Sequence, residues 1–406
     1  MTSSAQLKRD YIWNTLGSVM NALASVVLLI LVTQILGAYE GGVFSIAFAI
    51  AQQFQIVGHY EMRPYQATDV EERFSFGVYL ASRIVTCSLM MVGVFLYAFY
   101  SNGLSFEAVL LALLASLRFF DAFEDVFHGM FQQQGRLDIA GKAFFGRVCA
   151  MLVSFAVVLL VSRNLLIACI ASLGASLIAF IVLNVPEAKR RSTLRPVFSA
   201  SGIKSLLVAC LPLFLGSFLL MYVVNAPRYG IESAMSKEFQ TFYSILFMPA
   251  MVINLLSGFV FKPLLNTLAS LWARGDRRAF FGILAKGLLV VIGVTAAALL
   301  VGYWLGIPVL SFIYGIDLGG YRPELMVLLV GGGFNAAAVI GYYGLVTMRC
   351  QKAVLVGYGV TALMAFMAVR PAIVAGGLWG ASVLYTCLMA LLALILFALV
   401  AFLARR

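Results

Sequence analysis

Apolar residues recur along the chain in long runs, separated by short polar connections. A helix of about 20 apolar residues is long enough to cross the hydrocarbon core of a membrane. The pattern predicts twelve such helices, near residues 11–36, 41–60, 78–100, 105–131, 141–162, 165–185, 204–225, 239–262, 279–304, 323–348, 352–370 and 377–402. No connection is long enough to form a hydrophilic domain. We therefore expect an all-α polytopic membrane protein.

Composition supports this fold class. Of the 406 residues, 63% are hydrophobic and 11% are charged, which excludes an ordinary soluble globular domain. In a membrane protein the net charge of +11 indicates contact with anionic lipids, and we expect no nucleic-acid partner. The six cysteines lie singly in apolar segments without a CxxC motif, so we expect no disulfide, no metal site and no cofactor.

The polar connections alternate in charge. One alternate set holds most of the Lys and Arg residues, including Arg136, Lys142, Arg147 and the basic segment Asn184–Lys204. The other set holds only Arg163, Arg228, Lys237, Arg322 and Arg370. The positive-inside rule then predicts that both termini are cytoplasmic. The N-terminal residues lack a small-residue cleavage site, so we expect the first span to be retained.

The chain contains an internal repeat. The segment "SIAFAIAQQFQIVGHYEMRP" (Ser45–Pro64) aligns with "SILFMPAMVINLLSGFVFKP" (Ser244–Pro263), and a basic residue followed by proline ends both copies. Six spans precede the second half, so both halves enter the membrane from the same side. Parallel repeats of this kind are typical of transporters, with the substrate path between the halves. We predict an N-terminal six-helix lobe at 1–185, a basic linker at 186–203 and a C-terminal six-helix lobe at 204–406.

Polar side chains form a stripe on each of the first two spans. Their spacings of three and four residues place each set on one helical face. The stripe residues are Asn14, Ser18 and Asn21 on the first span, and Gln52, Gln55 and His59 on the second. In lipid such a stripe must face protein or water. Hydrogen bonds between helices explain the Ser and Asn residues, whereas the glutamines and histidine favour a wet, cavity-lining surface.

The fourth span carries a charged stripe of Arg118, Asp121, Asp125 and His128, with Glu124 beside it. At 1.5 Å per residue, Arg118 lies roughly 20 Å into the membrane. A charge there costs about 2.5–3.5 kcal/mol unless it is paired or hydrated. Two interpretations follow. Arg118 and Asp121 form an intrahelical ion pair that locks the helix, or Arg118 lines a cavity and contacts an anion while the acids and His128 act as gate or ion-coupling groups.

Two further arginines are candidates. Arg83 lies about a turn and a half inside the third span, where it could extend to the cytoplasmic surface. Arg228, in "NAPRYGIE", ends the seventh predicted span on the outer side. A topogenic role is disfavoured there, which makes a role in substrate binding or gating more plausible.

An enzymatic function is disfavoured. The sequence has no GxxxxGK[ST] loop for ATP and no HExxH metal motif. A membrane glycosyltransferase or polymerase needs acidic residues in an early outer loop, and here that loop is only "GAYEGG". The acidic cluster "DVEE" (Asp69–Glu72) is on the predicted cytoplasmic side and is interpreted as a solvated loop.

The sequence resembles the Wzx-type polysaccharide flippases of the MOP (multidrug/oligosaccharidyl-lipid/polysaccharide exporter) superfamily. The segments that carry the resemblance are "RPYQATDVEERFSFGVYLASRI" (Arg63–Ile84), "EDVFHGMFQQQGRLDIAGK" (Glu124–Lys142), "NAPRYGIE" (Asn225–Glu232) and "LFMPAMVINLLSGFVFKPLL" (Leu246–Leu265). The likeness runs through most of the chain. It implies a V-shaped pair of six-helix lobes that work by alternating access in the bacterial plasma membrane.

The resemblance also implies a cargo. It is an undecaprenyl-diphosphate-linked oligosaccharide, moved to the outer leaflet for cell-surface polysaccharide synthesis, with H+ or Na+ as a coupling ion and polysaccharide polymerases or glycosyltransferases as partners. A cationic cavity would attract the diphosphate, and Arg118, Arg228 and Arg83 are the candidates for that contact. A cation-coupled multidrug exporter and a peptidoglycan-precursor flippase are alternatives on the same fold.

Overall fold

The computed structural model describes residues 4–69, 71–103, 105–261 and 264–404. The repeat residues Lys262 and Pro263, and the basic residues Arg405 and Arg406, lie outside the described part of the chain. Every long element in the described ranges is helical, which confirms the predicted fold class. The chain divides by its internal contacts into two compact units, residues 1–218 and 219–406.

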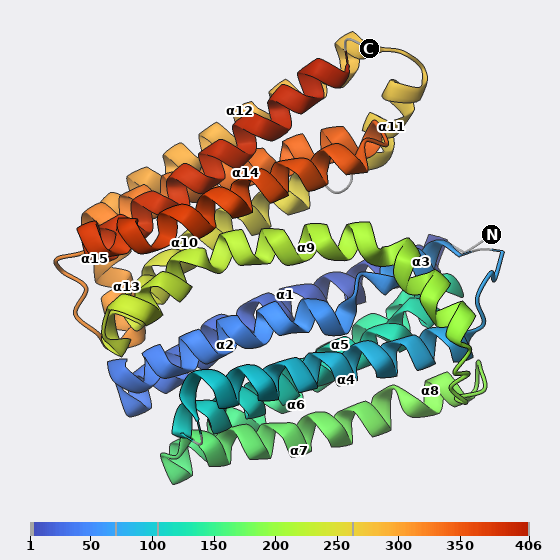
Figure 1. Cartoon of the computed structure of the whole chain (residues 1–406), viewed down its shortest axis with the longest axis horizontal. Helices are drawn as coiled ribbons and strands as arrows, with labels where there is room; N and C mark the ends of the chain where they lie inside the picture. The colour runs from blue at the N-terminus through green and yellow to red at the C-terminus, as the bar shows by residue number, and fades with distance from the viewer. Residues whose placement is uncertain (1–3, 70, 104, 262–263, 405–406) are drawn as a thin grey trace. The chain divides into compact units, whose positions relative to one another are not determined.

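Unit 1 contains six long helices that run alongside one another (Figure 1). They are α1 (Ser4–Leu36), α2 (Ala38–His59), α4 (Phe76–Asn102), α5 (Phe106–Gln133), α6 (Leu137–Ser162) and α7 (Leu165–Leu183). Two short helices join them, α3 (Met62–Thr68) and α8 (Val185–Lys189). Helix α5 packs against α2, α4 and α7, so the charged stripe of α5 lies in the interior of the unit.

Unit 2 is also built from long helices. It holds the end of α9 (Ala200–Ala234), then α10 (Lys237–Phe261), α12 (Arg277–Val301), α14 (Arg322–Thr347) and α15 (Gln351–Leu403). A π-helical segment η2 (Gly302–Gly306) connects α12 to α13 (Ile307–Tyr314) without a break, so this span extends past its predicted end at residue 304. The short helix α11 (Leu265–Ala273) follows α10 in unit 2, as α3 follows α2 in unit 1.

Ten helices are long and apolar enough to cross a membrane by length and composition. Helix α5 matches the predicted span 105–131 but carries too much charge to be among them. Helix α15 has 53 residues and holds the last two predicted spans, joined at Gly377. Gly377 has φ 54°, a left-handed conformation that glycine adopts without strain, and so the two spans need no intervening loop. With these two additions, each of the twelve predicted spans corresponds to a described helix or to one half of α15.

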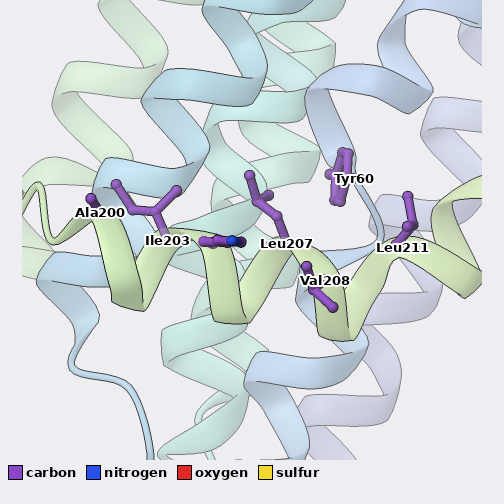
Figure 2. A pocket seen from close by; sticks show the side chains of 7 residues that line it. Tyr60, Ala200, Ile203, Leu207, Val208 and Leu211 are labelled. Carbon is purple, nitrogen blue, oxygen red and sulfur yellow. The ribbon is translucent and has the colours of Figure 1, made fainter.

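The first half of α9 packs on unit 1. Tyr60, at the end of α2, stacks on Phe214 with ring centroids 4.3 Å apart, and Gln53 donates a hydrogen bond to the carbonyl of Phe218. Between Tyr60 and α9 lies an apolar groove of about 330 Å³, bordered by Lys204 and Leu207 (Figure 2). These contacts explain why the compact units divide at 218, inside α9, rather than at the predicted linker 186–203. The predicted lobes 1–185 and 204–406 stay a prediction.

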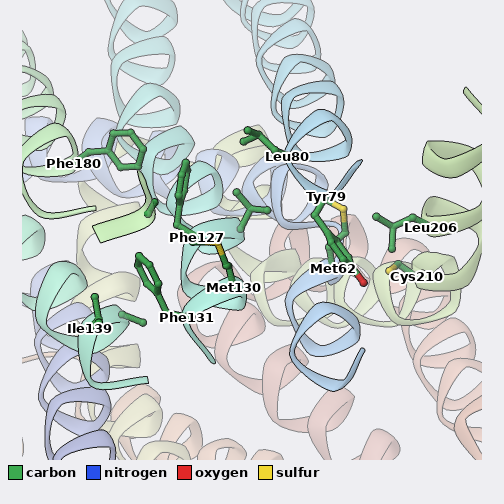
Figure 3. Packing of buried hydrophobic residues seen from close by; sticks show 13 residues of the cluster. Met62, Tyr79, Leu80, Phe127, Met130, Phe131, Ile139, Phe180, Leu206 and Cys210 are labelled. Carbon is green, nitrogen blue, oxygen red and sulfur yellow. The ribbon is translucent and has the colours of Figure 1, made fainter. Parts of the chain in front are cut away.

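The apolar core of unit 1 forms around aromatic side chains of α5. Phe127 packs edge-to-face on Phe180 of α7, with ring centroids 5.4 Å apart, and Phe131 is fully buried beside them (Figure 3). Leu206 and Cys210 extend the same cluster onto α9. Because this aromatic side of α5 is packed on its neighbours, the orientation of its charged stripe is fixed as well.

Candidate functional site

Asp125 of α5 is the centre of a first group of charges in unit 1. Its carboxylate lies 2.9 Å from Nη2 of Arg83, 3.2 Å from Nη1 of Arg63 and 3.4 Å from Nδ1 of His59. Arg83 is fully buried, and its Nη1 also donates to the carbonyls of Gly58 and His59, at 2.6 and 2.7 Å. Those carbonyls are available because α2 ends at His59, and no further helical turn supplies N–H groups that donate to them. One guanidinium therefore caps a helix end and neutralises a carboxylate.

A second group surrounds Asp121 and Glu124, one turn earlier on α5. Arg118 donates to Asp121 at 2.5 Å, so the predicted intrahelical ion pair is present. Arg147 of α6 donates both to Asp121 and, through Nε at 2.8 Å, to Glu124. Asn184, at the end of α7, donates a 3.3 Å hydrogen bond to the other oxygen of Glu124. The stripe of α5 is thus tied to α6 and α7 by charge-assisted hydrogen bonds.

The polar stripe of α2 joins these charges. Gln55 lies 3.0 Å from Nε2 of His59 and donates a 3.4 Å hydrogen bond to Asp121, so it connects the two groups. His128 is buried 4.0 Å from Glu124. The guanidinium of Arg118 also lies over the ring of Phe48, 4.3 Å from its centroid. We call the whole set the arginine–carboxylate network: Arg63, Arg83, Arg118, Arg147, Asp121, Glu124, Asp125, His59, His128, Gln55 and Asn184.

Two expectations about this network are wrong. Arg147 is not a cytoplasmic loop charge; it lies ten residues inside α6 and is fully buried against Asp121 and Glu124. Arg83 does not extend to the membrane surface; it points inward to Asp125. One signal in the sequence could have indicated both residues. The α5 stripe carries three carboxylates and one arginine, and buried carboxylates need a cation on another helix.

The remaining cavity-lining candidates are not part of the network. Asn14 and Ser18 are exposed on α1, and Ser18 bonds only the carbonyl of Asn14 at 2.8 Å. Asn21 and Gln52 are half-buried. Helix α1 packs closely on α6 next to this stripe, where Gly17 meets Gly141 and Phe144. Whether this stripe lines a wet surface stays a prediction.

Arg228 of α9 is a buried cation of unit 2. Its exposed fraction is 8%, and within the described part of unit 2 it forms no ion pair with a carboxylate. Its Nη1 donates to the amide oxygen of Asn225 at 2.9 Å, and its guanidinium carbon lies 5.1 Å from the ring centroid of Phe247 on α10. Its Nε is buried without a hydrogen-bond partner among the described residues. Arg228 therefore differs from the four arginines of the network, each of which has a carboxylate.

Buried polar atoms without partners lie on α9 beside this cation and on the face of α10 that carries Phe247. Tyr243 stacks on Phe247 at 5.9 Å, and Tyr385 of α15 packs edge-to-face on the same ring at 4.9 Å. Among the described residues, Asn225 Nδ2, the Tyr243 hydroxyl, the Ser244 hydroxyl and both polar atoms of Gln240 have no hydrogen-bond partner. An unsatisfied buried polar group costs about 1–3 kcal/mol. Unpartnered polar atoms on two helices that meet at Arg228 and Phe247 indicate a site for a polar ligand.

The described residues contain no group of three or more His, Cys, Asp and Glu side chains that could hold a metal ion. The six cysteines are free thiols.

No protein-family model and no curated protein matches the sequence. Solved structures match over nearly all of it. A mutant of the Vibrio cholerae MATE transporter VcmN superposes with a TM-score of 0.66 at 12% identity, covering 99% of this chain and 98% of that chain. An inward-facing multidrug resistance MATE family transporter of the MOP superfamily gives 0.62 at 17%, covering 100% and 95%. A MOP superfamily transporter from Pyrococcus furiosus, described by the reverse polarity of its binding pocket, gives 0.60 at 15%, covering 98% and 95%.

These likenesses establish the fold. The chain is a multi-pass membrane protein with the fold of the MATE transporters of the MOP superfamily. Its fold neighbours are transporters and not enzymes. Structures of such transporters include inward-facing and outward-facing conformations.

Proposed function

We propose that this chain is a flippase that moves a polyprenyl-diphosphate-linked oligosaccharide from the cytoplasmic to the outer leaflet by alternating access. The observation that carries the proposal is Arg228. It is a guanidinium buried in an apolar helix bundle, without a carboxylate among the described residues of its unit. Leaving a buried charge uncompensated costs several kcal/mol. A diphosphate cargo supplies the missing negative charge.

The other two candidate arginines differ in how free they are to bind. Arg83 is fully buried, and its two terminal nitrogens bond Asp125 and the end of α2. Arg118 has a carboxylate partner but keeps a small exposed fraction, 7%. We therefore rank Arg228 first as the diphosphate contact, Arg118 second and Arg83 third.

The network of unit 1 suits a second role. Asp121, Glu124 and Asp125 are held by charges on α3, α4 and α6, and His128 lies 4.0 Å from Glu124, so a change in the charge of one acid alters contacts between helices. We propose these residues as gate or ion-coupling groups, with H+ or Na+ as the coupling ion. We also propose that the protein works in the bacterial plasma membrane with both termini cytoplasmic. Anionic lipids and polysaccharide polymerases or glycosyltransferases are its proposed partners.

Complementation of a deletion strain tests the function. Arg228→Ala is expected to abolish surface polysaccharide while the protein reaches the membrane at its normal level. Arg228→Lys keeps the charge without the planar fork and is expected to restore export in part. Arg278→Ala removes an exposed cation of the same unit and serves as the matched control. Normal export by Arg228→Ala would show that Arg228 is not the diphosphate contact.

The alternatives predict other phenotypes. A multidrug exporter confers drug resistance on expression and leaves surface glycans unchanged on deletion. A peptidoglycan-precursor flippase gives lysis on depletion. A cationic drug is the cargo that the unpaired guanidinium of Arg228 disfavours most, because like charges repel strongly where water is excluded.

A further inference from the structure

We infer that Arg228, Asn225, Gln240, Tyr243 and Ser244 form a site for a phosphate-type oxyanion in the interior of unit 2. Only Arg228 was a candidate from the sequence; the α10 residues Gln240, Tyr243 and Ser244 carry no earlier assignment. The oxyanion is either a phosphoryl group of the cargo or free inorganic phosphate. The first identity rests on the proposed function, whereas the site itself does not.

One edge of the Arg228 guanidinium is free to contact the oxyanion. Asn225 accepts from Nη1 of Arg228, which leaves the edge formed by Nε and Nη2. Nε is buried and has no acceptor among the described residues. Two parallel N–H groups on one edge match two oxygens of a phosphate. The ring of Phe247 lies over the guanidinium and fixes its plane.

Helix α10 supplies the other donors from one face. Gln240, Tyr243, Ser244 and Phe247 follow one another at spacings of three, one and three residues, which places them on the same side of the helix. Tyr243 stacks on Phe247, and Phe247 in turn contacts Arg228. The ring of Tyr243 is thus one contact away from the guanidinium, and the unpartnered groups of Ser244 and Gln240 lie on the same helical face.

The donor set selects the charge of the ligand. Arg228 Nε and Asn225 Nδ2 can only donate, and the hydroxyls of Tyr243 and Ser244 can donate as well. A cation is repelled by Arg228, and water leaves its charge uncompensated. An oxyanion uses the donors and neutralises the guanidinium. Several donors around one edge suit a tetrahedral phosphate better than a single-atom halide.

Binding of labelled orthophosphate and pyrophosphate to the purified full-length protein in detergent tests the inference. Wild type is expected to bind both saturably. Tyr243→Phe, which removes one hydrogen bond to a charged group, is expected to lower the affinity roughly 10-fold or more, and Arg228→Gln roughly 100-fold. Tyr314→Phe is the matched control, because Tyr314 on α13 has a buried hydroxyl that also lacks a partner in the described part of unit 2. It is expected to bind as wild type does.

The thermal midpoint of each variant shows that it is folded, and Tyr243→Phe keeps the test valid if Arg228→Gln does not fold. Absence of saturable oxyanion binding, equal affinities of Tyr243→Phe and Tyr314→Phe, or chloride binding as tight as phosphate would overturn the site. Displacement of labelled phosphate by undecaprenyl diphosphate in mixed micelles identifies the cargo as the source of the oxyanion. Binding of free phosphate that this lipid does not displace identifies inorganic phosphate.

The two proposals fail separately. Oxyanion binding by wild type, together with unchanged glycans in the deletion strain, would support the oxyanion site and contradict the proposed cargo. An export defect in Arg228→Ala, with no oxyanion binding by the purified wild-type protein, would support the proposed cargo and contradict the oxyanion site.

Discussion

Arg83 and Asp125 form a buried ion pair, with 2.9 Å between Nη2 of the arginine and the carboxylate. Arg83 lies on α4 and Asp125 on α5, so the two residues are far apart in the sequence. Arg83 also donates to the two carbonyls that end α2. This one guanidinium therefore holds three helices together in the interior of unit 1.

Asp125→Asn is expected to destabilise the protein by about 3–5 kcal/mol, because it leaves the buried charge of Arg83 without a counter-ion. The measurement is thermal or denaturant unfolding of the purified protein in detergent. Glu187→Gln removes a carboxylate from a surface ion pair with Arg190 and is expected to cost less than about 1 kcal/mol. The double variant Arg83→Gln/Asp125→Asn should cost less than the sum of its single changes. Additive costs would show that the two side chains do not stabilise each other.

Arg147 and Arg118 share Asp121 but are not equivalent. Arg147→Met is expected to be the more destabilising change, because it leaves both Asp121 and Glu124 without their main cation. Arg118→Met removes one of two cations from Asp121 and leaves Arg147 in place. Unfolding of both variants under the same conditions checks the order. A larger loss in Arg118→Met would mean that Arg118, rather than Arg147, neutralises the pair of acids.

The fold was predictable from the sequence because membrane spans depend on local composition. Each apolar run is long enough to cross the bilayer by itself, so the twelve spans could be found one by one. Errors arise where a helix does not end with its apolar run. Helix α9 continues through Arg228 to Ala234, and α12 continues through η2 into α13, because packing inside the unit stabilises polar or irregular turns that composition alone would exclude.

For the candidate site, the sequence predicts which residues share a face of one helix, but not their partners on other helices. The spacing of Arg118, Asp121 and Asp125 shows their shared face, because helical periodicity is a local property. Their partners Arg63, Arg83 and Arg147 come from three other elements, and the sequence does not show which helices touch. The α10 donors were missed for the same reason. Gln240 and Tyr243 are unremarkable on their own helix, and only the position of Arg228 makes them a set.

A pH dependence is expected from Asp69, which follows α3 outside the membrane spans. Burial acts to raise the pKa of Asp69, but hydrogen bonds from the backbone N–H of Arg73 at 2.9 Å, the hydroxyl of Tyr79 at 2.8 Å and the backbone N–H of Phe74 at 3.2 Å outweigh it, and its pKa is lowered. A lowered pKa in the folded state means that the ionised carboxylate stabilises the fold. That stabilisation is fully present above the unfolded pKa of about 3.9 and is lost as pH falls through the folded pKa.

Thermal unfolding of wild type and Asp69→Asn from pH 7 to pH 3 measures this contribution. The difference between their midpoints is expected to stay constant from pH 7 to about pH 5 and to shrink below about pH 4. Tyr79→Phe removes one of the three hydrogen bonds and should show a smaller difference with the same trend. A midpoint difference that is independent of pH would show that the charge of Asp69 does not contribute.

Two glycines of long helices are expected to respond in opposite ways to alanine. At Gly141 on α6, a Cβ would lie 2.5 Å from the backbone carbon of Trp13 and 2.7 Å from the backbone nitrogen of Asn14, so α1 and α6 must move apart. Gly141→Ala is expected to destabilise the protein by about 1–3 kcal/mol, as overpacking does elsewhere.

At Gly293 on α12, by contrast, no heavy atom lies within 4 Å of the added Cβ. Gly293→Ala is expected to leave stability unchanged or raise it by up to about 1 kcal/mol, because alanine loses less backbone entropy in a helix. Unfolding of the two variants side by side makes the comparison. Equal effects would mean that α1 yields to the extra methyl group, and that the close contact of α1 with α6 does not limit the packing of unit 1.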